Sequence, residues 1–235
     1  MSSSPGRLTM DTSQTPLDIL LVGAAGLVGQ GVLRACLESP AVGRIVSLQR
    51  HRHDPGHPRV EVLLLEDFSQ ADTLQPALED LDACFYCAGA TPVGTPEHEY
   101  RRVTVDLTMA VARTFAAANP QGTFLYVSGA HADPRSGVMP LRVKGEAEQA
   151  LAALPVRTVS LRPAGVRPVA GTHTRHDALK PLYAVAGPLM RLGAAIAPSL
   201  VTDNLSVGKA MIALAAMPDP PASVTCRQIR RLAAG

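Results

Sequence analysis

The sequence has few aromatic residues and almost no excess charge. Aromatic side chains make up 3% of the 235 residues, tryptophan is absent, and 22 basic residues balance 20 acidic ones to a net charge of +2. Proteins that bind nucleic acids usually present a basic surface, and those that bind single strands add aromatic side chains that stack on bases. Neither feature is present, so we expect no nucleic-acid partner.

The chain also lacks a secretory leader and a complete metal-binding pattern. Residues 1–15 are polar, which predicts a loose tail, and the four cysteines are therefore expected to be reduced in the cytoplasm. Cys84 and Cys87 are spaced as a metal or redox pair, but no second pair or histidine cluster accompanies them. They lie in an expected strand, where residues three apart point to opposite faces, so buried structural thiols are the favoured interpretation.

What the chain does contain is enough apolar material for a folded core. Hydrophobic residues make up 46% and charged residues 18%, a composition that argues against disorder. The length suits one α/β domain over residues 16–235. Residues 182–201 are apolar over about the twenty residues of a membrane span, but glycines, prolines and Arg191 interrupt them. A buried helical region on the substrate side is therefore favoured, and no membrane partner is expected.

The most informative segment is an apolar run, residues 19–22, that breaks into spaced glycines and resumes with helical periodicity. A strand-to-helix turn of this kind directs backbone N–H groups and the positive end of a helix dipole at one point, which suits a pyrophosphate. We expect Gly23 to make the turn, Gly26 to let the phosphates approach and Gly29 to let the helix pack closely. The spacing is one residue longer than G-x-G-x-x-G, so a plain turn is the alternative.

Strand-like and helix-like segments alternate along the rest of the chain. Expected strands cover residues 44–48, 60–65, 82–87, 123–128 and 157–163, and expected helices cover residues 27–38, 71–81, 100–118 and 141–154. This alternation predicts an α/β fold with a doubly wound parallel sheet of Rossmann type and a small C-terminal substrate-side region. Ligands bind beyond the carboxyl ends of such strands, where the loops after residues 22, 48, 87 and 127 should meet.

The end of the second expected strand indicates which dinucleotide binds. An acid at this place bonds the ribose of NAD, whereas an arginine accommodates the 2′-phosphate of NADP. Arg50 stands here and no acid precedes Asp54, so NADP is favoured over NAD, with a solvated basic loop as the alternative. Asp67, after the third strand, is a candidate acceptor for the adenine amino group, with an exposed loop carboxylate as the alternative.

Five motifs in order carry a family resemblance. They are the glycine segment at 23–29, CAGAT at 87–91, YVSGA at 126–130, VKGEAE at 143–148 and LRPAGV at 161–166. Over residues 17–217 the chain resembles an atypical short-chain dehydrogenase/reductase, nearest to the branch that contains the Tat-interacting tumour-suppressor oxidoreductase. The resemblance implies a Rossmann fold, a nicotinamide cofactor and a site at the carboxyl ends of the strands.

The resemblance also implies roles for particular residues. In the family a tyrosine transfers the proton, a lysine four residues later holds the nicotinamide ribose, and a serine orients the carbonyl. Lys144 matches the lysine, but Pro140 stands at the tyrosine position, and Gly129 stands at the serine position with Ser128 one residue earlier. Lys144 and Ser128 are the expected catalytic residues. The expected cofactor contacts are Gly23, Ala25, Gly26, Leu27, Val28, Gly29, Arg50, Asp67, Cys87, Ala88, Gly89, Lys144 and Pro163.

The missing tyrosine leaves the proton donor open. Tyr126, His131 and a water molecule are the alternatives, and for Tyr126 a place in the core is the favoured interpretation. For Lys144 the alternative is an exposed helix lysine. The loop 171–177, with two histidines and an arginine, is expected either to bind an anion on the substrate side or to be a surface loop.

Two main functions follow, together with a third. The first is an NADP-dependent oxidoreductase acting on a small carbonyl or alcohol, in the cytoplasm, with a homodimer as a compatible assembly. The second is an NADP(H)-binding regulatory or scaffold protein in which Pro140 marks lost catalysis. A nucleotide-sugar epimerase is the third, but it normally needs the same tyrosine.

Overall fold

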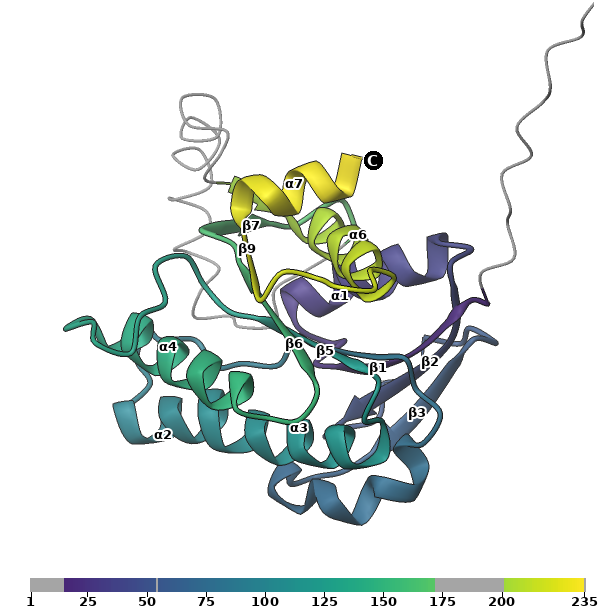
Figure 1. Cartoon of the computed structure of the whole chain (residues 1–235), viewed down its shortest axis with the longest axis horizontal. Helices are drawn as coiled ribbons and strands as arrows, with labels where there is room; N and C mark the ends of the chain where they lie inside the picture. The colour runs from purple at the N-terminus through teal and green to yellow at the C-terminus, as the bar shows by residue number, and fades with distance from the viewer. Residues whose placement is uncertain (1–14, 54, 172–200, 235) are drawn as a thin grey trace, which may run out of the picture.

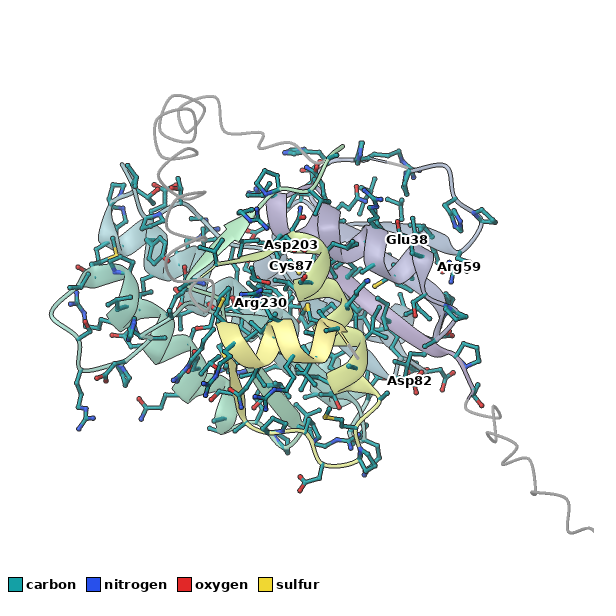
Figure 2. The ribbon with its side chains drawn as sticks, turned by 90° about the horizontal axis from the view of Figure 1, so that it is seen from above. Glu38, Arg59, Asp82, Cys87, Asp203 and Arg230 are labelled. Carbon is teal, nitrogen blue, oxygen red and sulfur yellow. The ribbon has the colours of Figure 1, made fainter. Side chains whose placement is uncertain are left out.

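The computed structural model describes residues 15–53, 55–171 and 201–234. Seven parallel strands form its main sheet in the order β3-β2-β1-β4-β5-β6-β9, which confirms the predicted doubly wound Rossmann-type fold (Figure 1). The strands are β1 Leu17–Val22, β2 Val42–Gln49, β3 Val60–Leu64, β4 Ala83–Tyr86, β5 Thr123–Val127, β6 Arg157–Arg162 and β9 Ser223–Thr225.

Helices cover both faces of this sheet (Figure 1). One face carries α1 (Leu27–Glu38), α6 (Asn204–Ala215) and α7 (Cys226–Ala234), and the other carries η1 (Phe68–Leu78), α3 (Leu107–Ala118) and α4 (Met139–Ala152). The alternation of side chains along a strand supplies a core to each face. In β1, Leu20 and Val22 pack on the α3 side, whereas Ile19 and Leu21 pack on the α1 side.

Three helices depart from their predicted bounds, and the one expected at 141–154 is α4, which begins and ends two residues earlier. The segment expected as a helix at 71–81 is 3₁₀-helical over Phe68–Leu78, in two pieces that meet at a kink at Gln70. It starts earlier than predicted because the Asp67 side chain accepts a hydrogen bond from the Ser69 amide. The helix expected at 100–118 begins at Glu97. It runs as α2 (Glu97–Arg101), a π-helical turn η2 (Arg102–Asp106) and α3 without a break in helical backbone angles.

The two cysteines of the Cys-x-x-Cys pair lie on opposite sides of the sheet. Cys84 is buried in the core under α3, and Cys87 packs against the core under α1. Their spacing along the strand produces this separation, as the alternation predicts. Burial raises the pKa of both thiols well above the ordinary value, as expected for structural thiols.

A second, two-stranded parallel sheet was not predicted. Its strands are β7 (Gly165–Arg167) and β8 (Val201–Asp203), and three residues are too few to show a periodicity in the sequence. Most of the apolar segment 182–201 and the loop residues 172–177 lie outside the described residues, as does the tail up to residue 14. Within the described ranges, no helix is both long and apolar enough to cross a membrane.

Candidate cofactor-binding site

The glycine turn between β1 and α1 has a backbone that only glycine fits at two positions. Gly23 has φ +85°, and a Cβ placed on it would lie 2.6 Å from the amide nitrogen of Ala88. A Cβ on Gly29 would lie 2.0 Å from the carbonyl oxygen of Gly23. Gly23 therefore makes the turn and Gly29 allows α1 to pack against it, as the spacing predicts.

The start of α1 is open and carries no negative charge of its own. Gly26 occupies the N-cap position without a side-chain cap, and the first turn contains no acidic residue. Within the described part of the chain, a Cβ on Gly26 would meet only the Gly23 carbonyl oxygen, at 3.4 Å, so these residues leave space on the outer side of the turn. Unpaired N–H groups at a helix start attract anions, and the turn that includes Ala25, Leu27 and Val28 therefore fits a phosphate group.

A side chain far along the chain holds this turn from behind. The Asn204 amide donates to the carbonyl oxygen of Leu27 at 2.8 Å, and its oxygen accepts from the amide of Val169 at 3.1 Å. Asn204 is fully buried. The sequence alone did not identify this residue, because the contact joins positions 177 residues apart.

The loop after β4 meets the glycine turn. The Cys87 amide donates to the carbonyl oxygen of Val22 at 2.8 Å, and the backbone of Ala88 touches Gly23. A Cβ on Gly89 would meet no atom of residues 15–53, 55–171 or 201–234 within 4 Å. The structure thus brings residues 87–89 beside residues 23–29, at the carboxyl edge where the fold places ligands.

The basic loop after β2 is closed by Gln49. Its side-chain oxygen accepts from the His53 amide at 2.8 Å, and its nitrogen donates to the His53 carbonyl and to the Ser47 hydroxyl, both at 2.9 Å. Gln49 is buried, whereas Arg50 and Arg52 between the two anchored ends are exposed. This clamp presents two guanidinium groups at the carboxyl end of β2, and sequence analysis missed it because Gln49 precedes the basic run.

Asp67 already has a local role. Its carboxylate accepts from the Ser69 amide at 3.0 Å and lies 3.7 Å from the Arg102 guanidinium. Hydrogen bonds from Ser69 lower the pKa of this carboxyl. Capping of η1 by an exposed carboxylate is sufficient to explain an aspartate at this position. A contact between Asp67 and adenine stays a prediction.

Lys144 on α4 extends to the end of β5. Its ammonium nitrogen donates to the Val127 carbonyl at 3.1 Å and to the Tyr126 hydroxyl at 3.4 Å, and it lies 5.0 Å from the centre of the Tyr126 ring. Burial lowers the pKa of Lys144 to about 8, and the Glu148 carboxylate opposes that shift. Lys144 is therefore not an exposed helix lysine.

Glu148, one helical turn after Lys144, holds Arg162 at the end of β6. The Arg162 Nε atom lies 3.0 Å and 3.1 Å from the two carboxylate oxygens, and its Nη2 also donates to Oε2. Glu148 has 10% of its side chain exposed. The pair fixes α4 on the sheet directly behind Lys144, and the only hint in the sequence is the four-residue spacing of Lys144 and Glu148.

The groups expected to handle a carbonyl substrate are only partly present. Ser128 is 5% exposed, and its buried hydroxyl has no hydrogen-bond partner among the described residues. A Cβ on Gly129 would lie 3.3 Å from the Lys144 Cδ atom, so Gly129 faces Lys144. Pro140 is in the first turn of α4, where proline is tolerated because the missing N–H has no helical partner.

Tyr126 belongs to the core. It is almost fully buried, 6.2 Å from the Tyr86 ring, and burial raises the pKa of its hydroxyl well above the ordinary value. A buried phenol of this kind is a poor proton donor near neutral pH. The structure therefore supports the core interpretation of Tyr126.

No family model matches this chain. A curated relative from Purpureocillium lilacinum, leucinostatins biosynthesis cluster protein T, is 28% identical over 186 residues, which cover 70% of this chain and 69% of that protein. The mitochondrial protein fmp52 of Emericella nidulans is 28% identical over 209 residues, 83% of this chain and 85% of the relative. The fmp52 protein of Aspergillus clavatus is 34% identical over 62% of this chain and 65% of its own length.

These relatives correct one expectation. The Fmp52 relatives from several fungi are named mitochondrial proteins, which contradicts the cytoplasmic location expected from the polar start of the chain. The prediction of a cytoplasmic location was therefore wrong.

Solved structures share the fold. The Bordetella bronchiseptica enzyme WbmF in complex with NAD+ has a TM-score of 0.65 at 15% identity, over 92% of this chain and 77% of its own. A short-chain dehydrogenase from Burkholderia cenocepacia in complex with NADP has a TM-score of 0.63 at 18% identity, over 94% and 92%. At such identities the likeness establishes a Rossmann-type fold, and both of these neighbours were solved with a nicotinamide dinucleotide.

Proposed function

We propose that this protein is an atypical short-chain dehydrogenase/reductase of the Tat-interacting branch that binds NADP(H) and acts on a small carbonyl or alcohol. One observation supports it above the others. An open, uncapped helix start at Gly26 and a held lysine at Lys144 both lie at the carboxyl edge of one parallel sheet. This is the edge at which Rossmann-type folds bind dinucleotides.

The residues of the site fit the parts of a dinucleotide. The turn from Gly23 to Gly29 would hold the pyrophosphate, with residues 87–89 beside it. Lys144 would hold the hydroxyls of the nicotinamide ribose, and Pro163 would line the nicotinamide end. When bound, the nicotinamide supplies a hydride, and the protein positions the substrate and moves the proton.

NADP is preferred over NAD in this proposal because of the clamped loop after β2. Arg50 and Arg52 are exposed at the end of β2, and no acidic side chain stands between Gln49 and His53 to bond a free 2′-hydroxyl. Two guanidinium groups favour a phosphate through charge and paired hydrogen bonds. The neighbours that were solved with NAD+ and with NADP leave this choice to experiment.

A second function is favoured by Pro140. Loss of a general acid or base typically lowers rate about 10²–10⁴-fold, and proline has no ionisable group. An NADP(H)-binding regulatory or scaffold protein would keep the glycine turn and dispense with the proton donor. It would bind cofactor with no turnover.

The experiment titrates the purified protein with NADPH and, separately, with NADH. Nicotinamide fluorescence is the readout, and no tryptophan emission interferes with it because the chain has no tryptophan. We expect saturable binding of both, with NADPH bound more tightly. Turnover on a panel of aldehydes, ketones and quinones then separates the oxidoreductase from the scaffold. Absence of binding to either cofactor would refute both.

A further inference from the structure

The loop after β5 contains a residue in an unusual backbone conformation. The Ala132 amide donates to the Gly129 carbonyl at 3.3 Å, which closes a four-residue turn, and His131 is the third residue of this turn with φ +61°. A turn with positive φ at its third position normally takes glycine or asparagine there. The chain instead has a histidine, at some cost in backbone energy.

The position of His131 in the fold distinguishes it from the other non-glycine residue with positive φ among the described residues. Among the described residues, Asp80 is the one other non-glycine residue with positive φ. Asp80 lies in the turn before β4, at the amino edge of the sheet, whereas His131 follows β5 at the carboxyl edge. Strained backbone at a ligand-binding edge is a reason to look for function.

The turn is anchored to the candidate site on both sides of His131. The Ala130 amide donates to the Pro163 carbonyl at 2.9 Å, and Gly129 faces the Lys144 side chain. On the other side, the Asp133 amide donates to the Leu141 carbonyl at 3.1 Å, on the first turns of α4. His131 is thus one residue from the Pro163 anchor and two residues from the anchor on α4.

Gly145 shows how closely the loop packs on α4. A Cβ on Gly145 would lie 2.3 Å from the Pro134 nitrogen. The loop therefore rests on the helix one residue after Lys144, and its backbone has little freedom to move. A fixed backbone is what a proton donor needs for its side chain to return to one place.

Among the described residues around Lys144, the other groups considered as donors are engaged or absent. Pro140 has no proton to give, Tyr126 is sealed in the core, and Lys144 donates to Val127 and Tyr126. His131 is exposed, and an imidazole is the side chain that most often transfers protons in enzymes. We propose that His131 is the proton donor of this site, in place of the tyrosine that Pro140 replaces.

The step balances without a further reactant, and it rests on the proposed oxidoreductase function. Reduced nicotinamide, when bound, would supply a hydride to the substrate carbonyl carbon. The C=O π electrons would move to oxygen, and the imidazolium N–H of His131 would give its proton to that oxygen. The products are the alcohol, the oxidised nicotinamide and neutral imidazole, which regains a proton from water.

The test compares His131→Asn, His131→Gly and the control Asp80→Gly in the full chain. Asparagine and glycine both accept positive φ, so neither should disturb the turn, and neither transfers a proton. We measure the melting temperature, the Kd for NADPH and the kcat with para-nitrobenzaldehyde and phenanthrenequinone as probes. We expect both His131 variants to lose about 10²–10⁴-fold in kcat. Their Kd for NADPH should stay within threefold of the wild-type value. Their melting temperature should equal or exceed that of wild type.

Three outcomes overturn the proposal, the third because it removes the oxidoreductase function on which the proposal rests, and one outcome supports it. A His131→Asn variant that keeps kcat within threefold shows that the donor is elsewhere, and one that loses cofactor affinity and melting temperature along with kcat shows a structural role. Recovery of His131→Gly turnover by added imidazole supports proton transfer, since a structural role would not respond. Asp80→Gly should match wild type in kcat. A wild-type protein that binds NADPH and reduces neither probe contradicts the oxidoreductase function itself, and the role of His131 with it.

Discussion

The ammonium nitrogen of Lys144 lies 3.4 Å from the hydroxyl oxygen of Tyr126 and 3.1 Å from the carbonyl oxygen of Val127. Both acceptors belong to the last residues of β5, so this strand fixes the position of the Lys144 ammonium group. The lysine is largely buried and hydrogen-bonded, so its ammonium group is held in one place. The same burial has a measurable consequence for stability.

We predict that the stability of the protein rises with pH through the titration of Lys144. Its pKa is about 8 in the folded chain and 10.5 when unperturbed, so between these values the unfolded state binds the proton and the folded state does not. The unfolding free energy of wild type should therefore gain about 2–3 kcal/mol relative to Lys144→Met over this range. Urea unfolding of both proteins at several pH values measures this difference. A constant difference across the range would show that the lysine is well solvated.

Replacement of Glu148 should affect both the fold and Lys144. Glu148→Gln leaves the Arg162 guanidinium without its bidentate partner, and we expect a loss of about 2–3 kcal/mol in unfolding free energy. The Glu148 charge also raises the pKa of Lys144, so its removal should lower that pKa further. Urea unfolding at several pH values should therefore show that the unfolding free energy begins to rise with the titration of Lys144 at a lower pH than in wild type. If this rise begins at the same pH in both proteins, Glu148 affects stability only through its ion pair with Arg162.

The two glycines of the turn offer a matched pair. Gly29→Ala places a Cβ 2.0 Å from the Gly23 carbonyl oxygen, so we expect a loss of at least about 2 kcal/mol in stability together with cofactor binding. Gly26→Ala meets only that oxygen, at 3.4 Å, and should keep stability within about 1 kcal/mol. It should nevertheless weaken NADPH binding, because the Cβ stands on the open side of the turn. Equal NADPH affinity in Gly26→Ala and wild type would argue that no phosphate passes there.

The Gln49 clamp should determine cofactor choice. Gln49→Ala removes the bonds that hold both backbone groups of His53, and Arg50→Ala removes one of the presented guanidinium groups. We expect each to weaken NADPH binding about tenfold, which is the order of one charge-assisted hydrogen bond, with NADH binding within twofold of wild type. Titrations of the two cofactors measure the ratio. Equal affinity of wild type for both, unchanged by Arg50→Ala, would make the loop a plain surface feature.

The features of this molecule that could be predicted from the sequence are those determined by patterns among residues close together in the chain. The alternation of apolar runs and helical stripes located the strands of the main sheet except β9, and the spacing of Gly23 and Gly29 located the turn. The end of α1 at Glu38 also follows from the Ser-Pro pair after it. These features depend on neighbours in the chain, so a single sequence carries them.

The contacts that could not be predicted join segments distant in sequence. Asn204 reaches the start of α1, and Arg162 meets Glu148 across two elements. The strain at His131 depends on a turn that the loop closes only after packing on α4. Pro140 was visible in the sequence, but the engagement of Tyr126 and Lys144 became clear only with the side chains in place.

The central claim is that a dinucleotide lies across the turn that opens α1, and a crystal structure grown with NADPH tests it most directly. The account predicts the pyrophosphate against residues 23–29, the 2′-phosphate beside Arg50 and the nicotinamide ribose within hydrogen-bond distance of Lys144. Electron density for NADPH elsewhere, or side chains occupying the edge beside Gly26 at saturating cofactor, would contradict it.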